Sequence, residues 1–169
     1  TMIADICCEY VIVGHSERRT MFGDNEVAVA KKVAATFRNG MKPLLCVGEN
    51  AKERTEGKTA RKISMQINNA FKGLQAEQAK EVVVAYEPLW AIGSGQAATA
   101  KDAQEVCHLI REKLTTMFGE KISRQVRILY GGSVNENNAV AFKISGIDGV
   151  LVGGASLNAK AFSAIVRSF

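Results

Sequence analysis

The sequence lacks the features that mark secreted, membrane-spanning and zinc-stabilised proteins. It contains no apolar run long enough to cross a bilayer, and it does not open with a secretory signal pattern. None of the four cysteines forms a C-x-x-C pair and there are only two histidines, so no structural zinc site or other metal site is expected. Free thiols are typical of a reducing compartment. We therefore expect a cytoplasmic protein that does not contact a membrane.

Linkers, low-complexity stretches and clusters of basic residues are also missing. The chain has 169 residues, a length typical of one domain, and only two prolines. Apolar residues make up 47% and charged residues 23%, which leaves enough apolar material for a sizeable core. The net charge is +5, but the basic residues are scattered and not interleaved with aromatic ones. This charge predicts a solvated surface and small anionic ligands, and no nucleic-acid partner.

Short apolar runs alternate with amphipathic helical patterns along the whole chain. The runs are nearly continuous in apolar residues, as expected of parallel strands buried on both faces. Thr99 and Asp102 form a capping box before one helix, and Asn135 is predicted to cap a later, short one. The pattern is that of an α/β protein with five consecutive βα units, whose strands are predicted at 10–14, 43–47, 82–86, 126–130 and 149–152 and whose helical stripes cover 27–37, 63–74, 106–117 and 162–169.

Five units are too few for a closed parallel barrel, which takes eight strands and about 250 residues. An open doubly wound sheet can stop at five strands, but its edges need protection by charge, proline or short length. The first strand (YVIV, 10–13) and the last (GVLV, 149–152) are apolar throughout. Both therefore resemble interior strands without their neighbours. We expect residues 1–169 to form a single domain that is the C-terminal part of a larger protein, with its N-terminal units absent.

Two glycine pairs each follow an apolar strand near the end of the chain, at Gly131-Gly132 and at Gly153-Gly154. Glycine has no Cβ, so a turn there lets several backbone N–H groups approach a ligand closely. Two such turns after consecutive parallel strands favour one phosphate site built from two loops, as at the last two strands of a (β/α) barrel. The alternative is a pair of ordinary tight turns.

A histidine and a glutamate follow the first predicted strand, in the segment Gly14-His15-Ser16-Glu17. A histidine between a strand and a helix start feels the positive end of the helix, which favours the neutral imidazole, a hydrogen-bond donor. A capping or packing role for His15 remains an alternative, as does a solvated helix-start role for Glu17. The other histidine, His108, falls within a helical pattern and is assigned to surface or packing.

The third predicted strand ends at Glu87 and Pro88, where barrel enzymes carry catalytic residues. Pro88 forces the residue before it into an extended backbone. The apolar Trp90, Ala91 and Ile92, followed by glycines and small residues, are typical of a lid over a site. A carboxylate beneath such a lid loses water and becomes a stronger base. The alternative is a plain connection with a solvent-exposed Glu87.

The segments GHSERR, LLCVGE, AYEPLWAIGSG, YGGSV and VGGAS, in this order, resemble the triosephosphate isomerase family over essentially the whole chain. That family has an eight-stranded TIM barrel, and this chain resembles strands four to eight. The resemblance implies interconversion of dihydroxyacetone phosphate and D-glyceraldehyde 3-phosphate by proton transfer through an enediolate, in glycolysis and gluconeogenesis. It implies no cofactor, and it implies a cytoplasmic homodimer for the complete protein.

The same resemblance implies a role for each site residue. Glu87 would be the base, and His15 would be the neutral group that polarises the carbonyl oxygen. Glu17 would be an electrostatic and structural partner, and Cys46 would pack near the base. The remaining residues implied are Gly93, Ser133, Gly153 and Gly154 for substrate phosphate, and Pro88, Trp90, Ala91, Ile92 and Tyr130 for the lid.

The chain departs from the family pattern in two places. The family's first strand supplies an Asn-x-Lys motif whose lysine stabilises the enediolate, whereas the segment 39–42 (NGMK) is predicted at a helix end. Losing one preorganised charge costs on the order of a hundred- to a thousand-fold in rate, so we expect little or no turnover from this chain alone. A non-catalytic phosphate-binding fragment is the alternative. Ser94, Gln96 and Ala97 replace the usual lid residues, which affects the expected closing kinetics and not the reaction.

Overall fold

A parallel five-stranded sheet organises the chain in the computed structural model, which describes residues 1–92 and 98–169. The strands pair in the sequential order β1-β2-β3-β4-β5. A barrel has this sequential order, whereas a doubly wound sheet reverses its order at a switch point. The predicted partial-barrel α/β fold is therefore confirmed. The strand bounds are β1 (Tyr10–Val13), β2 (Lys42–Val47), β3 (Val83–Tyr86), β4 (Arg127–Tyr130) and β5 (Gly149–Val150).

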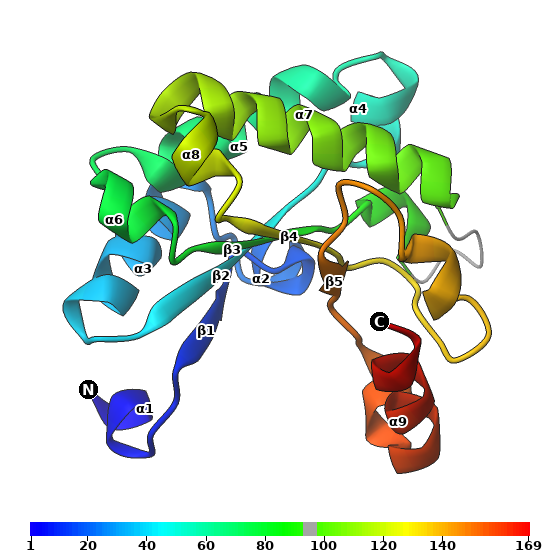
Figure 1. Cartoon of the computed structure of the whole chain (residues 1–169). Helices are drawn as coiled ribbons and strands as arrows, with labels where there is room; N and C mark the ends of the chain where they lie inside the picture. The colour runs from blue at the N-terminus through cyan, green and yellow to red at the C-terminus, as the bar shows by residue number, and fades with distance from the viewer. Residues whose placement is uncertain (93–97) are drawn as a thin grey trace.

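Helices connect the strands, and the longest of them form a layer on one side of the sheet (Figure 1). In this layer α5 packs against both α3 and α7, while α9 lies beyond β5. No helix of the described ranges has the length and apolar character needed to cross a membrane. The bounds are α1 (Met2–Asp5), α2 (Ser16–Met21), α3 (Glu26–Arg38), α4 (Ala51–Thr55), α5 (Thr59–Phe71), α6 (Ala76–Ala79), α7 (Ala100–Phe118), α8 (Glu120–Ser123) and α9 (Ala159–Ser168), with 3₁₀ helices η1 (Leu89–Ala91), η2 (Ala139–Phe142) and η3 (Gly154–Leu157).

One predicted helix cap is confirmed and another is wrong. The Asp102 N–H donates to Thr99 Oγ1 and the Thr99 N–H donates to Asp102 Oδ2, both at 3.1 Å, which closes the capping box before α7. Asn135 does not cap η2, because its side-chain oxygen accepts the N–H groups of Asn137 and Asn138 in the preceding turn. Such local bonds compete with helix formation. The 3₁₀ helix η2 therefore begins only after Asn138.

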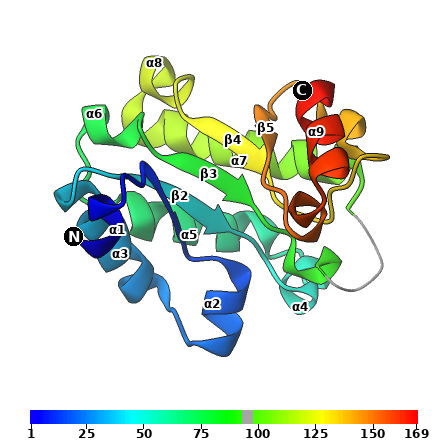
Figure 2. The same cartoon turned by 90° about the horizontal axis from the view of Figure 1, so that it is seen from below.

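The apolar strand residues divide between the two faces of the sheet because side chains alternate along a strand. Val13, Leu45 and Val84 belong to the core beneath the helices and are at most 2% exposed. On the opposite face of β1, Tyr10 is 38% exposed and Ile12 is 52% exposed. Figure 2 shows β1 and β5 at the two sides of the sheet, where each has one neighbouring strand among the described elements.

All five strands run in the same direction, so their carboxyl ends gather at one edge of the sheet. β5 is shorter than predicted, since it ends at Val150. The Leu151 N–H still donates to the Tyr130 carbonyl at 2.8 Å, after which the chain turns into η3. The second glycine pair therefore lies at the same edge as the segments that follow β1, β3 and β4.

Candidate active site

A hollow of about 400 Å³ lies at the carboxyl ends of the strands. Segments that follow β1, β3, β4 and β5 form its walls, because parallel strands end at one edge. Most of the residues predicted for catalysis and phosphate binding therefore meet there. The lining residues are His15, Ser16, Glu17, Glu87, Ile92, Gly131, Gly132, Ser133, Val134, Asn135, Leu151, Gly153 and Gly154.

Glu87 follows β3 and is only 2% exposed, so the alternative of a solvent-exposed glutamate is wrong. Its N–H donates to the Val47 carbonyl at 2.7 Å, which extends the pairing of β2 and β3 by one residue. Glycines on both sides leave room for it. A Cβ on Gly48 would lie 1.8 Å from the Glu87 carbonyl oxygen, and a Cβ on Gly131 would lie 3.1 Å from Glu87 Cγ.

His15 and Glu87 face each other in the hollow. His15 Nε2 lies 3.1 Å from Glu87 Oε1, and the Ser16 N–H donates to Glu87 Oε2 at 2.9 Å. His15 is the N-cap of α2, and its Nδ1 accepts the Glu17 N–H at 3.4 Å. A ring nitrogen that accepts a hydrogen bond carries no proton, which leaves Nε2 as the nitrogen that can donate. His15 is thus arranged as a donor toward Glu87.

Burial dominates the electrostatics of Glu87. Desolvation raises the pKa of its carboxyl group, while His15 and the Ser16 N–H act in the opposite direction. A carboxylate with a raised pKa is a stronger base once ionised. Cys46 lies beside it, and desolvation together with the Glu87 charge raises the pKa of this thiol well above its usual value. The structure therefore places Cys46 as a neutral buried thiol next to the carboxylate, and all four cysteines are free.

The two glycine pairs line the side of the hollow formed after β4 and β5. None of these four glycines has a positive φ, so backbone handedness does not explain them. Gly132 is required by packing, because a Cβ there would lie 2.1 Å from the Tyr130 hydroxyl oxygen. Gly153 and Gly154 have no atom within 4 Å of a Cβ position, which leaves their backbone open to the hollow. The predicted Gly93 lies outside the described residues, as do Ser94, Gln96 and Ala97.

The residues predicted to form a lid lie in different places. Ile92 lines the hollow, and the Ala91 carbonyl accepts the Ser133 hydroxyl at 3.2 Å. Trp90 does not line the hollow, because its Nε1 donates to Glu49 Oε1 at 3.0 Å. An indole N–H needs a partner when it is partly buried, and Glu49 supplies one. Trp90 is therefore not among the apolar residues that face the site.

Tyr130 is buried behind the first glycine pair. Its ring stacks on Phe142 with the centroids 4.0 Å apart. Burial raises the pKa of Tyr130 to about 12, and the Ala98 backbone N–H acts in the opposite direction. Ala98 is the first described residue after position 97. The Tyr130 hydroxyl thus lies near the end of the connection that leads into α7.

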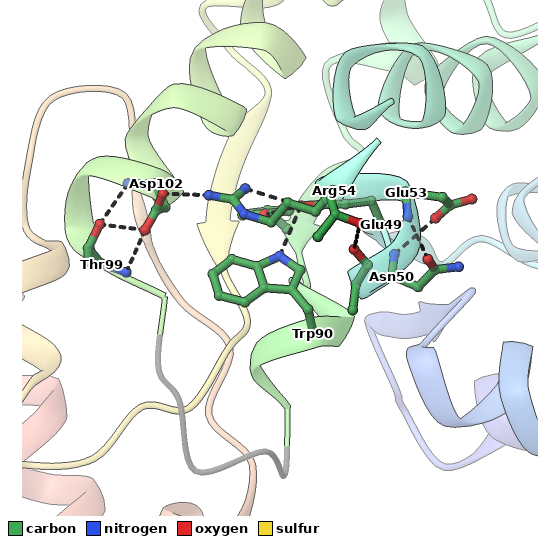
Figure 3. A network of polar contacts seen from close by, with 10 residues as sticks. Glu49, Asn50, Glu53, Arg54, Trp90, Thr99 and Asp102 are labelled. Atoms are coloured by element: carbon green, nitrogen blue, oxygen red, sulfur yellow. Dashed lines mark hydrogen bonds and ion pairs between the residues drawn. The ribbon is translucent and has the colours of Figure 1, made fainter. Parts of the chain in front are cut away.

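A network of polar contacts around one buried glutamate was not predicted from the sequence (Figure 3). Glu49 follows β2 and is 0% exposed. Its Oε1 accepts the Tyr86 hydroxyl and Trp90 Nε1–H at 3.0 Å each, and Arg54 at 3.4 Å. A signal was available, because Glu49 follows a buried strand as Glu87 does.

The described lining of the hollow contains neither lysine nor arginine. Two of its side chains, Glu17 and Glu87, are acids. An anionic ligand there would depend on backbone N–H groups of the glycine turns. No group of three or more potential metal ligands occurs within residues 1–92 and 98–169.

Comparison with known proteins identifies the family. A family model described as triosephosphate isomerase matches residues 1–169. Curated relatives named triosephosphate isomerase include one from Acetivibrio thermocellus, 49% identical over 98% of this chain and 66% of its own length. The relative from Moorella thermoacetica is 51% identical over 98% of this chain and 67% of its own length. The one from Dictyoglomus thermophilum is 45% identical over 99% and 68%, respectively.

The chain spans about two thirds of the length of these curated relatives. The strands pair in sequential order, and the carboxylate of Glu87 faces the imidazole of His15. Both observations agree with a family match that runs from the first residue to the last. The chain belongs to the triosephosphate isomerase family.

Proposed function

We propose that the complete polypeptide containing this chain interconverts dihydroxyacetone phosphate and D-glyceraldehyde 3-phosphate. The observation that carries the proposal is the 3.1 Å contact between Glu87 Oε1 and His15 Nε2. It lies in a hollow that the two glycine turns also line. A buried base and a neutral N–H donor at one point suit the removal of a proton beside a carbonyl group.

Glu87 is the proposed base. Its carboxylate takes a proton from the carbon beside the carbonyl and returns it to the neighbouring carbon, so the electrons pass through an enediolate and no cofactor is required. His15 Nε2–H donates to the substrate oxygen on which charge builds, and this pairing of glutamate with neutral histidine is the family's established one. A separation of 3.1 Å leaves no space for substrate between the two groups. One of them must therefore swing aside as substrate enters.

Substrate phosphate is proposed to lie against the backbone N–H groups of Ser133, Gly153 and Gly154, with Glu17 as an electrostatic partner beside His15. Lys42 cannot supply the cation, because it begins β2 and pairs with Glu81 at 2.5 Å. The positive charge for the enediolate then comes from the third of the relatives' length that this chain does not span. Residues 1–169 alone are therefore proposed to bind phosphate with little turnover, since a preorganised charge is worth about a hundred- to a thousand-fold in rate.

The family assignment supports a place in glycolysis and gluconeogenesis for the complete enzyme. We propose that it works in the cytoplasm as a homodimer, with triose phosphates as its small-molecule partners and without nucleic acid or membrane. Sedimentation of the complete polypeptide tests the dimer, and a monomer at micromolar concentration would contradict it.

Glu87→Gln in the complete polypeptide tests the proposed chemistry. Glutamine keeps the shape and still accepts the Ser16 N–H, but it cannot take up a proton. Steady-state isomerisation is expected to fall by about a hundred- to ten-thousand-fold. The calorimetric Kd for glycerol 3-phosphate, an unreactive analogue, is expected to stay within about twofold, because binding depends on the glycine turns.

The exposed Glu105 of α7 provides a matched control, and Glu105→Gln is expected to keep the wild-type rate. Turnover by Glu87→Gln at the rate of this control would remove Glu87 from the role of base. A wild-type complete polypeptide without isomerase activity would overturn the proposed function itself.

A further inference from the structure

One guanidinium group joins the two described ends of the connection between β3 and α7 (Figure 3). Arg54 of α4 lies over the indole of Trp90, with its Cζ 4.4 Å from the ring centroid. Its NH2 donates to Asp102 Oδ1 at 2.5 Å, and its NH1 lies 3.4 Å from Glu49 Oε1. Trp90 belongs to η1 and Asp102 to the first turn of α7. A residue from a third element thus touches both ends.

Each end that Arg54 touches is itself anchored. Trp90 Nε1–H is bound to the buried Glu49, which also accepts the Tyr86 hydroxyl. Asp102 Oδ2 accepts the Thr99 N–H at 3.1 Å and the Thr99 hydroxyl at 2.6 Å. Arginine can serve both ends because its planar group presents donors in two directions while its face stacks on an aromatic ring. Lysine offers a charge without that fork.

The η1 end carries part of the candidate site. Ile92 follows η1 and lines the hollow, and the Ala91 carbonyl of η1 accepts the Ser133 hydroxyl. A shift of η1 therefore moves one wall of the hollow. Arg54 does not line the hollow, so it can influence the site only through the residues it holds.

We propose that Arg54 is a positioning residue that holds η1 and the start of α7 together, so that Ile92 and the Ala91–Ser133 contact keep their places beside Glu87. This inference rests on the proposed function of the same site. A simpler role for Arg54 is to compensate the buried charge of Glu49. That role does not account for the 2.5 Å bond to Asp102, which ties the guanidinium to a different element.

The test compares Arg54→Met, Arg54→Lys and Asp102→Asn in the complete polypeptide. Arg124→Met is the matched control, because Arg124 is exposed and its ion pair is with Glu120 of α8, the short helix that Arg124 caps. Trp90 is the single tryptophan of this chain, so ¹⁹F NMR of 5-fluorotryptophan protein, assigned with Trp90→Phe, reports on η1 directly. Calorimetric Kd for glycerol 3-phosphate and steady-state kcat and KM report on the site.

Arg54→Met is expected to shift the Trp90 resonance and to raise both Kd and KM about tenfold, the effect of losing one charge-assisted hydrogen bond. Asp102→Asn is expected to raise Kd about threefold, because it weakens the bond between Arg54 and Asp102 and leaves the contacts of Arg54 with Trp90 and Glu49 intact. Arg54→Lys is expected to bind as weakly as Arg54→Met, since it restores charge without the fork. The pH dependence of kcat/KM is expected to stay that of the wild type, because Arg54 does not touch Glu87.

The proposal is overturned if Arg54→Met and Asp102→Asn both bind glycerol 3-phosphate as tightly as the control Arg124→Met does. Full recovery of binding in Arg54→Lys would also overturn it, in favour of simple charge compensation. If Arg54→Met does not fold, Asp102→Asn decides, since it keeps the side-chain shape and the Glu49 pair. Failure of the proposed function is distinguishable, because it would abolish turnover in the wild type while analogue binding and the Trp90 signal still report on Arg54.

Discussion

Gly48 is expected to be irreplaceable because β2 and β3 approach each other closely at their carboxyl ends. A Cβ there would lie 1.8 Å from the Glu87 carbonyl oxygen and 2.7 Å from its carbonyl carbon. Both are backbone atoms, and the Glu87 N–H is already bound to the Val47 carbonyl at 2.7 Å. In Gly48→Ala the two segments must therefore separate by about an ångström. Forced expansion of a packed region costs about 1–3 kcal/mol, and the rigid surroundings place this case near the upper figure.

The same displacement moves the proposed base. A loss of about 3 kcal/mol corresponds to a fall in melting temperature of about 6–12 °C for a chain of this class. An ångström of misplacement at a reacting group costs about a hundredfold in kcat. Calorimetry and steady-state kinetics on the complete polypeptide measure the two effects. Gly154→Ala is the control for stability, because no atom lies within 4 Å of its Cβ position and its φ is not positive. If Gly48→Ala melts at the same temperature as Gly154→Ala and keeps the wild-type kcat, then position 48 does not require glycine.

Three further predictions concern the buried Glu87, the partly buried Arg111 and the two buried thiols. Burial raises the pKa of Glu87 in the folded protein above 4.5, its ordinary value. Between pH 4.5 and the raised pKa, the folded protein binds more protons than the unfolded protein does. The folded protein therefore loses stability as pH rises through that interval. The melting temperature of Glu87→Gln relative to the wild type should therefore increase as pH rises above the ordinary pKa of 4.5, and a pH-independent difference would contradict this. Arg111 donates to the Val126 carbonyl at 2.6 Å and to Asp148 at 3.0 Å. Arg111→Met should lower the free energy of unfolding in urea by about 1–3 kcal/mol, mostly through the lost bonds to backbone carbonyls, whereas a loss no larger than that of Arg124→Met would show that these bonds contribute little. Burial raises the pKa of Cys107 to about 12 and also raises that of Cys46. A thiol reagent at neutral pH should leave both unlabelled until urea unfolds the protein, and rapid labelling of either in peptide maps of the folded protein would count against their burial.

The features that could be predicted from the sequence depend on local patterns. The capping box of Thr99 and Asp102 requires only residues three positions apart, and it starts α7 as expected. His15 and Glu87 each come just after a continuous apolar run, and parallel strands bring such positions to one edge. Their meeting in one hollow therefore follows from the predicted order of βα units, without knowledge of any side-chain contact.

The features that could not be predicted depend on contacts between distant segments. Nothing near Trp90 in the sequence shows that its N–H turns to Glu49, which lies 41 positions away. Glycine is needed at position 48 because the Glu87 backbone, just after the neighbouring strand β3, lies too close for a Cβ. The sequence cannot distinguish this glycine from one that only forms a turn. Arg54 reaches Asp102 across 48 positions. Asn135 forms a side-chain turn and not the expected helix cap, because the two have the same local sequence pattern.

In the proposed reaction, Glu87 moves a proton between two carbons of the substrate while His15 donates to its oxygen. A direct test lets the complete polypeptide convert dihydroxyacetone phosphate in D₂O. ¹H NMR then measures how much of the carbon-bound proton signal of the product is lost because deuterium has replaced the proton. Wild type and Glu105→Gln should form product that carries deuterium from the solvent, and Glu87→Gln should lose both conversion and labelling. Conversion and labelling by Glu87→Gln at the wild-type rate would show that Glu87 does not move the proton.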